Sequence, residues 1–286
     1  MKIISLQSIS LAFVFSLGMG LFPVQAQYVS ITSTDPYSGT DDFEFQTGGT
    51  IFATGAFGGS GSLTGDEGAG TKMIWYAKKA AFRAGRVASQ TGTSPNIYYL
   101  WDDAVIGSYS VAMGYDTLAS QSYTTAFGNG SKATGVDASA FGLGSTASGT
   151  ASTAFGDGTT ASGNRSTALG GSTIAYGGYS IAAGLHTTSY GSYGTALGYY
   201  TAAEAYACLA IGRYNRGLGT RLTWVNTDSL FEIGNGTSAT DEKNAFVVDK
   251  SGNVTAQGKM RCSPGGELSM GSFTATPSGV PIPANL

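Results

Sequence analysis

A strict 14-residue repeat runs through the middle of the chain and constrains its fold more than any other feature. When one alanine of each unit is numbered position 0, glycine follows at position +2 in eight successive units, without insertion or deletion. The eight alanines are Ala112, Ala126, Ala140, Ala154, Ala168, Ala182, Ala196 and Ala210. A disordered glycine- and serine-rich linker has no reason to keep such a register, so the period predicts a regular repeat architecture.

Each unit contains a second, similar half. Position +5 is serine or threonine, position +7 is alanine except at Ser189, and position +9 is glycine between Gly135 and Gly191. This alternation with a period of two indicates short strands whose side chains point to opposite faces. We therefore expect two strands and two turns per unit, with the small residues at −2, 0, +2, +5, +7 and +9 lining a thin lumen. Stacked units of this kind form an all-β parallel solenoid.

Large apolar residues occupy position +1, which strand parity directs away from the lumen. They are Met113, Phe127, Phe141, Phe155, Leu169, Leu197 and Ile211, with Ala183 as the small member of the series. A ladder of this size on the outside of a thin roll is a large exposed apolar patch, and a lumen of small residues buries little area. The pattern therefore predicts obligate association of identical chains and leaves their number open.

The motif Ser-x-Ala-Φ-Gly, as in Ser110-Val111-Ala112-Met113-Gly114, resembles the head repeats of trimeric autotransporter adhesins, the YadA-like or haemagglutinin-type repeats. The resemblance covers about residues 101–219. It implies a left-handed parallel β-roll and a homotrimer in which the apolar residues at +1 form the interface around a three-fold axis. It also implies attachment to host matrix proteins or other cells, without catalysis.

The rest of the chain divides around the repeat. We expect a signal peptide at 1–26 (ending in Val-Gln-Ala), an N-terminal region and cap at 27–100, head repeats at 101–219, a C-terminal cap or neck with a hairpin at 220–260, and a flexible tail at 261–286. The last segment lacks the alternating strands of a membrane barrel. We therefore expect any outer-membrane anchor to be a separate protein.

A basic and aromatic run, residues 70–86, precedes the repeat. Its cations Lys78, Lys79, Arg83 and Arg86 are a candidate ligand patch, but a solvated face is the commoner meaning of such a run. Its aromatic residues suit a cap over the first coil. Residues 101–107 resemble an opening half-coil, because Gly107 falls at +9.

The sequence offers no catalytic constellation and implies no cofactor or metal. His186 is the only histidine and falls at a turn position, while the adjacent Asp102 and Asp103 point to opposite faces if they lie on a strand. The net charge of −3 argues against nucleic acid as a partner. Cys208 falls at a lumen position, which indicates a buried free thiol, with a disulfide to Cys262 as the alternative.

Tyrosines gather at outward positions of the later units and are the candidate ligand-binding residues: Tyr176, Tyr179, Tyr190, Tyr193, Tyr199 and Tyr200. Exposed tyrosines suit contacts with an extracellular protein or a glycan. They equally suit ladders that only stabilise the coils. We expect a secreted or surface-displayed, non-enzymatic adhesin head, with a tail-spike-like fibre or an ice-binding solenoid as alternatives.

Overall fold

The computed structural model describes residues 30–35, 39–46, 50–53, 57–58, 69–88 and 100–258. The expected signal peptide and C-terminal tail, together with Cys262, lie outside the described residues. Strands dominate the described part, which holds one turn of 3-10 helix, η1 (Ala77–Lys79), and no α-helix.

The strands fall into three groups: those before the coils, those of the coils, and those after them. Before the coils lie β1 (Ser30–Asp35), β2 (Gly39–Gln46), β3 (Thr50–Ala53), β4 (Gly70–Tyr76) and β5 (Ala81–Val87). The long strands of the coils are β6 (Val111–Tyr115), β8 (Thr125–Asn129), β10 (Ser139–Leu143), β12 (Thr153–Asp157), β14 (Thr167–Gly171), β16 (Ile181–Leu185), β18 (Thr195–Tyr199) and β20 (Leu209–Arg213). The short strands are β7 (Leu118–Ala119), β9 (Lys132–Ala133), β11 (Thr146–Ala147), β13 (Thr160–Ala161), β15 (Ile174–Ala175), β17 (Thr188–Ser189) and β19 (Ala202–Ala203). After the coils come β21 (Ser229–Asn235), β22 (Asn244–Asp249) and β23 (Val254–Ala256).

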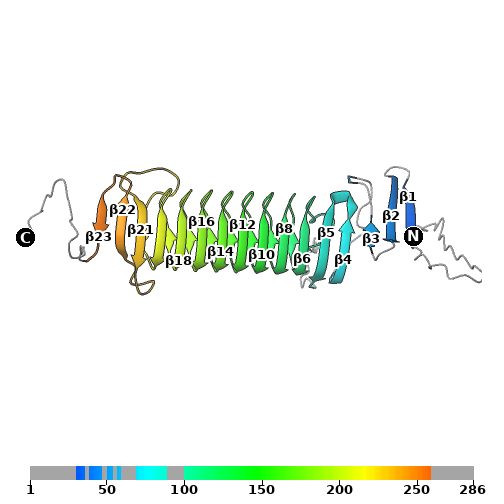
Figure 1. Cartoon of the computed structure of the whole chain (residues 1–286), viewed down its shortest axis with the longest axis horizontal. Coiled ribbons are helices and arrows are strands. Elements are labelled where there is room, and N and C mark those ends of the chain that lie inside the picture. The colour runs from blue at the N-terminus through cyan, green and yellow to red at the C-terminus, as the bar shows by residue number, and fades with distance from the viewer. Residues whose placement is uncertain are drawn as a thin grey trace, which may run out of the picture.

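The coils stack into a straight solenoid whose strands lie side by side along its axis (Figure 1). The long strands belong to a 13-stranded sheet, and the short strands form a separate seven-stranded sheet. Equivalent residues pair in parallel from coil to coil, as Ala140 does with Ala126 and Ala154. The predicted all-β parallel solenoid of 14-residue coils is therefore confirmed.

The space between the two sheets is filled by small side chains. The alanines at positions 0 and +7 are fully buried, and so are the serines and threonines at −2 and +5. An alanine brings much less apolar area out of water than a leucine or phenylalanine does. The lumen thus holds the two sheets close together but supplies a weak hydrophobic core.

The glycine at position +2 does not line the lumen, contrary to our expectation. Most of these glycines are exposed, and their φ angles lie between 97° and 141°, a region that L side chains rarely adopt. A Cβ atom on Gly142 would lie 2.0 Å from the carbonyl oxygen of Gly156 in the next coil. Glycine is required there because the long strand turns its backbone directly onto the neighbouring coil.

Two columns of residues with positive φ form the turns of each coil. One column is at position −3 and the other at position +4. Glycine fills the second column at Gly130, Gly144 and Gly158, and residues with side chains take the other left-handed turn positions. The tyrosines with positive φ are Tyr109, Tyr123, Tyr179, Tyr193, Tyr200 and Tyr214.

Antiparallel strands extend the long sheet beyond both ends of the coils. The β4–β5 hairpin precedes β6, and β5 pairs with β6 in parallel. At the other end β21 pairs in parallel with β20, although Leu209 and its partner Phe231 are 22 positions apart rather than 14. The predicted hairpin of residues 244–258 is confirmed by the antiparallel pairing of β22 with β23.

Replacing Gly142 with alanine is expected to destabilise the fold by more than about 3 kcal/mol, because the new Cβ meets a backbone oxygen at a strained φ. Gly144→Ala is the matched control. Gly144 also has a positive φ, 61°, but a Cβ there meets nothing within 4 Å. The control should cost only about 1 kcal/mol. Urea unfolding of both variants at one chain concentration measures the difference, and equal losses would contradict the close-approach argument.

Candidate functional site

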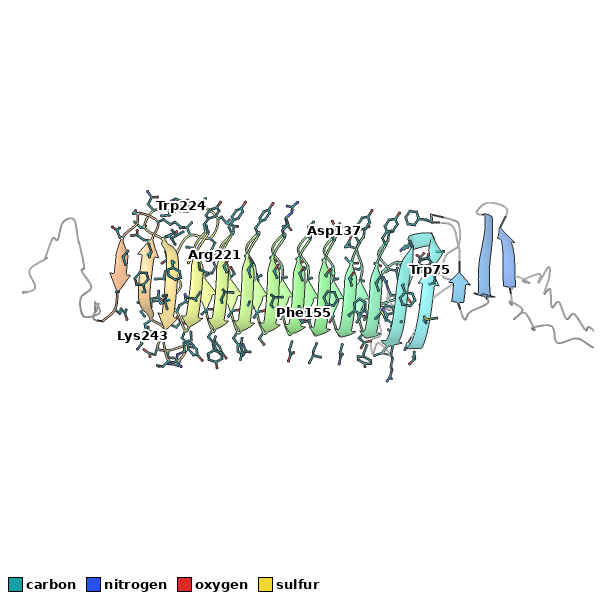
Figure 2. All side chains as sticks on the ribbon, in the orientation of Figure 1. Trp75, Asp137, Phe155, Arg221, Trp224 and Lys243 are labelled. Carbon is teal, nitrogen blue, oxygen red and sulfur yellow. The ribbon has the colours of Figure 1, made fainter. Side chains whose placement is uncertain are left out.

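The outer face of the long sheet carries a continuous column of the apolar residues at position +1. Each side chain pairs with its equivalent in the next coil, so that the rings of Phe127 and Phe141 stack with centroids 5.6 Å apart and those of Phe141 and Phe155 lie 5.9 Å apart. Phe155 is 58% exposed, and Leu169 and Leu197 are also exposed. Figure 2 shows Phe155 on this face, midway along the solenoid. All seven candidate interface residues therefore lie in one column of one chain.

The same column continues into the strands on both sides of the repeat. Met113 pairs with Ala84 on β5, and Ala84 pairs with Met73 on β4, whose side chain is 73% exposed. At the other end Ile211 pairs with Ile233, which in turn pairs with Phe246 on β22. The sequence analysis missed this continuation because the register of an antiparallel hairpin does not follow from the 14-residue period.

The candidate tyrosines do not form one band. Tyr176 and Tyr190, at position +8, lie just beyond the short strands with ring centroids 5.3 Å apart. Tyr179 and Tyr193, at the turn after the short strands, stack at 5.1 Å with nearly parallel rings. Tyr199 and Tyr200 lie at the opposite turn, where the long strands end. The structure therefore divides the six tyrosines among three places: the end of the short strands, the turn that follows it, and the opposite turn.

The connection between β20 and β21 folds over the edge that carries Tyr176 and Tyr190. The guanidinium of Arg221 lies 4.1 Å from the ring centroid of Tyr190 and forms an ion pair of 2.8 Å with Glu204. Leu218, Leu222 and Trp224 of this connection are exposed. Figure 2 shows Arg221 and Trp224 near this end of the solenoid. The sequence analysis did not select these residues. The loss of the 14-residue period after Gly219 is the sequence signal that the chain leaves the regular coil there.

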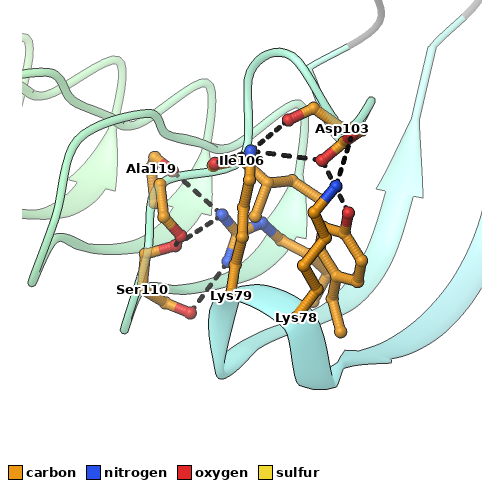
Figure 3. A network of polar contacts seen from close by, with 9 residues as sticks. Lys78, Lys79, Asp103, Ile106, Ser110 and Ala119 are labelled. Carbon is orange, nitrogen blue, oxygen red and sulfur yellow. Dashed lines mark hydrogen bonds and ion pairs between the residues drawn. The ribbon is translucent and has the colours of Figure 1, made fainter. Parts of the chain in front are cut away.

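The basic run before the repeat is not a simple solvated face, contrary to the interpretation we favoured. Lys79 Nζ donates to the carbonyl oxygen of Ile106 at 2.8 Å and to that of Asp103, and it pairs with the Asp103 carboxylate at 3.2 Å. The Tyr76 hydroxyl donates to the same carboxylate at 2.6 Å. This hydrogen bond, with both lysines nearby, lowers the pKa of Asp103. Figure 3 shows Lys78 and Lys79 converging on Asp103.

Residues 100–105 form consecutive turns rather than the expected half-coil strand. Asp103 in this segment pairs with Lys78 and Lys79. Trp101 of the same segment is fully buried at the end of the lumen. Trp101 Nε1 donates to the carbonyl oxygen of Thr117 at 2.9 Å. The segment thus joins the β4–β5 hairpin to the first coil.

Arg83 is fully buried in the column that alanine occupies in every coil, since it pairs with Ala112. Its guanidinium donates to the carbonyl oxygens of Phe82, Ser110 and Ala119 at 2.8–2.9 Å and to the hydroxyl of Ser110 at 2.7 Å. Burial lowers the pKa of Arg83 to about 10, so the side chain is still a cation at neutral pH. Figure 3 labels the Ser110 and Ala119 acceptors.

Glu232 occupies the same column at the other end, where it pairs with Ala210 and is almost fully buried. Asn215 lies beside it and acts as a substitute for the missing next coil. The Asn215 side chain accepts from the backbone N–H of Ala202 at 2.6 Å and donates both to the Ala202 carbonyl oxygen and to Glu232. Burial is the main cause that raises the pKa of Glu232.

The direction of the hydrogen bonds explains why donors complete the first coil and acceptors complete the last one. The outward residues of each short strand donate to the following coil, as Ser120 does to Ala133 and Thr134 does to Ala147. The first coil therefore has carbonyl oxygens that need donors, which Trp101 and Arg83 supply. The last coil has N–H groups that need acceptors, which suits an amide and a carboxylate.

In the part of the chain that the structure describes, the remaining reactive side chains do not form a catalytic arrangement. His186 stacks on Tyr200 with ring centroids 4.4 Å apart. Cys208 is a free, buried thiol at the predicted lumen position, and burial raises its pKa to about 12. Within the described ranges, no three histidine, cysteine or acidic side chains gather as metal ligands.

Comparison with known proteins identifies the coils. Residues 106–131, 133–159, 147–173, 161–187 and 175–201 match the family model described as YadA head domain repeat (2 copies). No curated protein matches the chain. None of the helices in the described segments is long and apolar enough to cross a membrane.

Glu232→Gln is expected to raise the free energy of unfolding at pH 7 and to change it little at pH 4. At low pH the Glu232 carboxyl is protonated in both the folded and the unfolded chain, so the variant has little effect there. Because the pKa of Glu232 is raised in the folded chain, the parent loses stability as the pH rises from the ordinary value of 4.5 through the folded-state pKa. Glutamine keeps an acceptor for Asn215 without a buried charge. Urea unfolding at both pH values measures the effect, with the exposed Glu242→Gln as control. A variant that is less stable than the parent at pH 7 would contradict this account.

Proposed function

Because residues 106–201 are YadA head repeats, we propose that this chain forms the adhesive head of a secreted or surface-displayed protein. In this proposal three identical chains assemble as left-handed β-rolls around a three-fold axis. The head binds an extracellular protein or glycan and catalyses no reaction. The signal peptide at 1–26 exports the chain.

The apolar column on the long sheet is the observation that carries the proposal. The lumen is lined by alanine, serine and threonine, so the largest apolar side chains of the coils point outward, with Phe155 58% exposed. An isolated chain would present this column to water along the whole sheet. Identical, in-register columns from three chains can pack against one another around an axis parallel to the solenoid, which buries them without any change of fold.

The strands flanking the coils support the expected caps. The β4–β5 hairpin covers the first coil through Arg83 and Lys79, and Asn215 and Glu232 complete the last one. A solenoid needs its terminal coils covered because their backbone edges otherwise pair with other strands. In this proposal β21, β22 and β23 act as the neck of the trimer.

The surface around Tyr176 is the proposed attachment site. Tyr176 and Tyr190 project from the short-sheet side, away from the apolar column. One face of Tyr190 is covered by Arg221, whereas the coil before Tyr176 has only the small Ser162 at the same position. Tyr176 is 49% exposed and stacks on Tyr190, whose ring lies against Arg221 of the exposed connection. Aromatic rings beside an arginine are typical of protein-binding surfaces.

The geometry favours adhesion over the alternative of ice binding. An ice-binding solenoid requires rows of outward-facing threonine on a flat face. Here the threonines of position +5, such as Thr159, Thr173 and Thr187, are fully buried in the lumen. The outward row of the short sheet at position +6 is mixed: Leu118, Lys132, Thr146, Thr160, Ile174, Thr188 and Ala202.

Changing Phe127, Phe141 and Phe155 together to aspartate is expected to convert the trimer into monomers or to prevent folding, because three carboxylates would be buried in the interface. Sedimentation velocity of the purified chain measures the mass. The matched control changes Lys132, Thr146 and Thr160, on the outer face of the short sheet, to aspartate and should remain trimeric. A parent protein that sediments as a folded monomer would overturn the proposed assembly.

Tyr176→Ser is expected to weaken attachment at least several-fold while leaving the trimer intact. Binding of the purified head to a panel of immobilised matrix proteins and to a glycan array measures the effect. The control is Tyr123→Ser, an exposed tyrosine at the other end of the solenoid. If both variants bind as the parent does, the surface around Tyr176 is not the attachment site.

A further inference from the structure

We propose that the two aromatic edges of the later coils are contacts between neighbouring copies of the chain. The first edge is the turn at position −3, with Tyr179 and Tyr193. The second edge is the end of the long strand at positions +3 and +4, with Tyr199 and Tyr200. In the assembly the first edge of one copy packs against the second edge of the next. This inference rests on the proposed homotrimer and assigns these tyrosines to it rather than to a ligand.

The two edges are aromatic at the same height along the solenoid. Around β16 and β18 the first edge carries Tyr179 and Tyr193, and the second edge carries His186 and Tyr200. Around β20 only the second edge is aromatic, with Tyr214 opposite Ala207. Around β10 and β12 neither edge is aromatic: the first edge has Asp137 and Ala151, and the second has Leu143, Gly144, Asp157 and Gly158. Copies related by a rotation axis along the solenoid meet at equal heights, so matched edges are what such an arrangement requires.

The aromatic edges coincide with small residues in the apolar column. The column has Phe141 and Phe155 on β10 and β12, where the edges are small, but Ala183 and Leu197 on β16 and β18, where the edges are aromatic. Large side chains in the column hold the long sheets away from a central axis, and small ones allow them to approach. From β10 to β18 the edges thus become aromatic where the column becomes small. A further aromatic pair, Tyr109 and Tyr123, lies on the first edge beside Met113 and Phe127.

The dimensions of a coil allow neighbouring edges to touch. A long strand of five residues is about 16 Å long at ~3.3 Å per residue, so each edge lies about 8 Å from the middle of the strand. Three such sheets arranged as the sides of a triangle have touching edges when each lies about 5 Å from the axis, from the same strand length. Alanine and leucine side chains permit a separation of that order, and the tyrosines fill the space that remains.

The left-handed backbone of these tyrosines has a conformational cost that contacts within one chain do not clearly exceed. Tyr179, Tyr193, Tyr200 and Tyr214 all have φ between 42° and 59°, where a non-glycine residue costs about 1 kcal/mol. At the turn of Tyr200 and Tyr214, the coils around β10 and β12 place Gly144 and Gly158 without this cost. At the turn of Tyr179 and Tyr193, those coils carry Asp137 and Ala151, which also have positive φ. Stacking of two rings stabilises the fold by about 0.5–1.5 kcal/mol per pair. This gain only offsets the cost of the positive φ angles. A contact with another copy gives these exposed side chains a net stabilising role.

The stacked arrangement argues against a sugar as the occupant of these edges. A sugar ring packs on the face of an aromatic ring. The faces of Tyr179 are taken by Tyr193 at 5.1 Å and by Arg165, which also donates a hydrogen bond to the Tyr179 hydroxyl. Tyr200 lies between His186 and Tyr214, with centroids 4.4 Å and 4.8 Å away. Ring edges and hydroxyl groups are left exposed, and these suit another protein surface.

The test uses chemical cross-linking of the full chain with Cys208 and Cys262 replaced by serine. Serine is the residue that other coils hold at the position of Cys208, as at Ser166 and Ser180. Tyr193→Cys and Tyr199→Cys are introduced together, one on each edge of the same coil, and treated with a short bismaleimide. The matched control is the pair Ala151→Cys and Asp157→Cys, at the same two positions three coils earlier.

The Tyr193→Cys/Tyr199→Cys protein is expected to give covalent dimers and trimers on a denaturing gel, at least ten-fold more than the control pair. Each single variant should stay monomeric on the gel, because one edge meets the other and never itself. Sedimentation of the untreated proteins separates the two proposals. A trimer that does not cross-link, or that cross-links equally in both coils, overturns the edge contact alone. A monomer overturns the proposed assembly and the edge contact with it.

Discussion

The structure depends on the close approach of backbone between successive coils. Each +2 glycine places its Cα against a carbonyl oxygen of the next coil, as Gly142 does against Gly156, and the alanine lumen keeps the two sheets equally close. This spacing leaves no room for large side chains inside. The apolar residues that stabilise ordinary domains therefore lie outside, and the outer face of the long sheet becomes a surface for association.

The same stacking gives the solenoid a direction, and its two ends require different chemistry. The first coil presents carbonyl oxygens and is completed by donors from Trp101 and Arg83. The last coil presents N–H groups and is completed by Asn215, which Glu232 supports. Buried donors at one end and buried acceptors at the other are thus a consequence of one hydrogen-bonding direction.

The outer surface divides into regions with separate functions in our proposals. The apolar column and the aromatic edges serve assembly, and the short-sheet side around Tyr176, with the connection that carries Trp224, serves attachment. The tyrosines that the sequence places in one group separate because positions −3, +3 and +8 lie on different sides of a flat coil. The tyrosines at the left-handed turns stack on one another, so their ring faces are occupied. They therefore suit contacts between chains better than sugar binding.

The sequence by itself determined the coil, its period, its lumen alanines and its outward column, because a two-residue alternation within an exact repeat fixes which side chains face inward. It also identified the hairpin of β22 and β23 from its turn. It did not reveal that the +2 glycine lies outside the lumen, since a positive φ inside a strand breaks the parity on which that inference rested. Only the tertiary structure decided that Arg83 and Glu232 replace alanine at the lumen ends, and that Met73 and Phe246 extend the apolar column. Those residues lie outside the period, and their positions follow from strand pairing between distant segments, which local pattern does not encode.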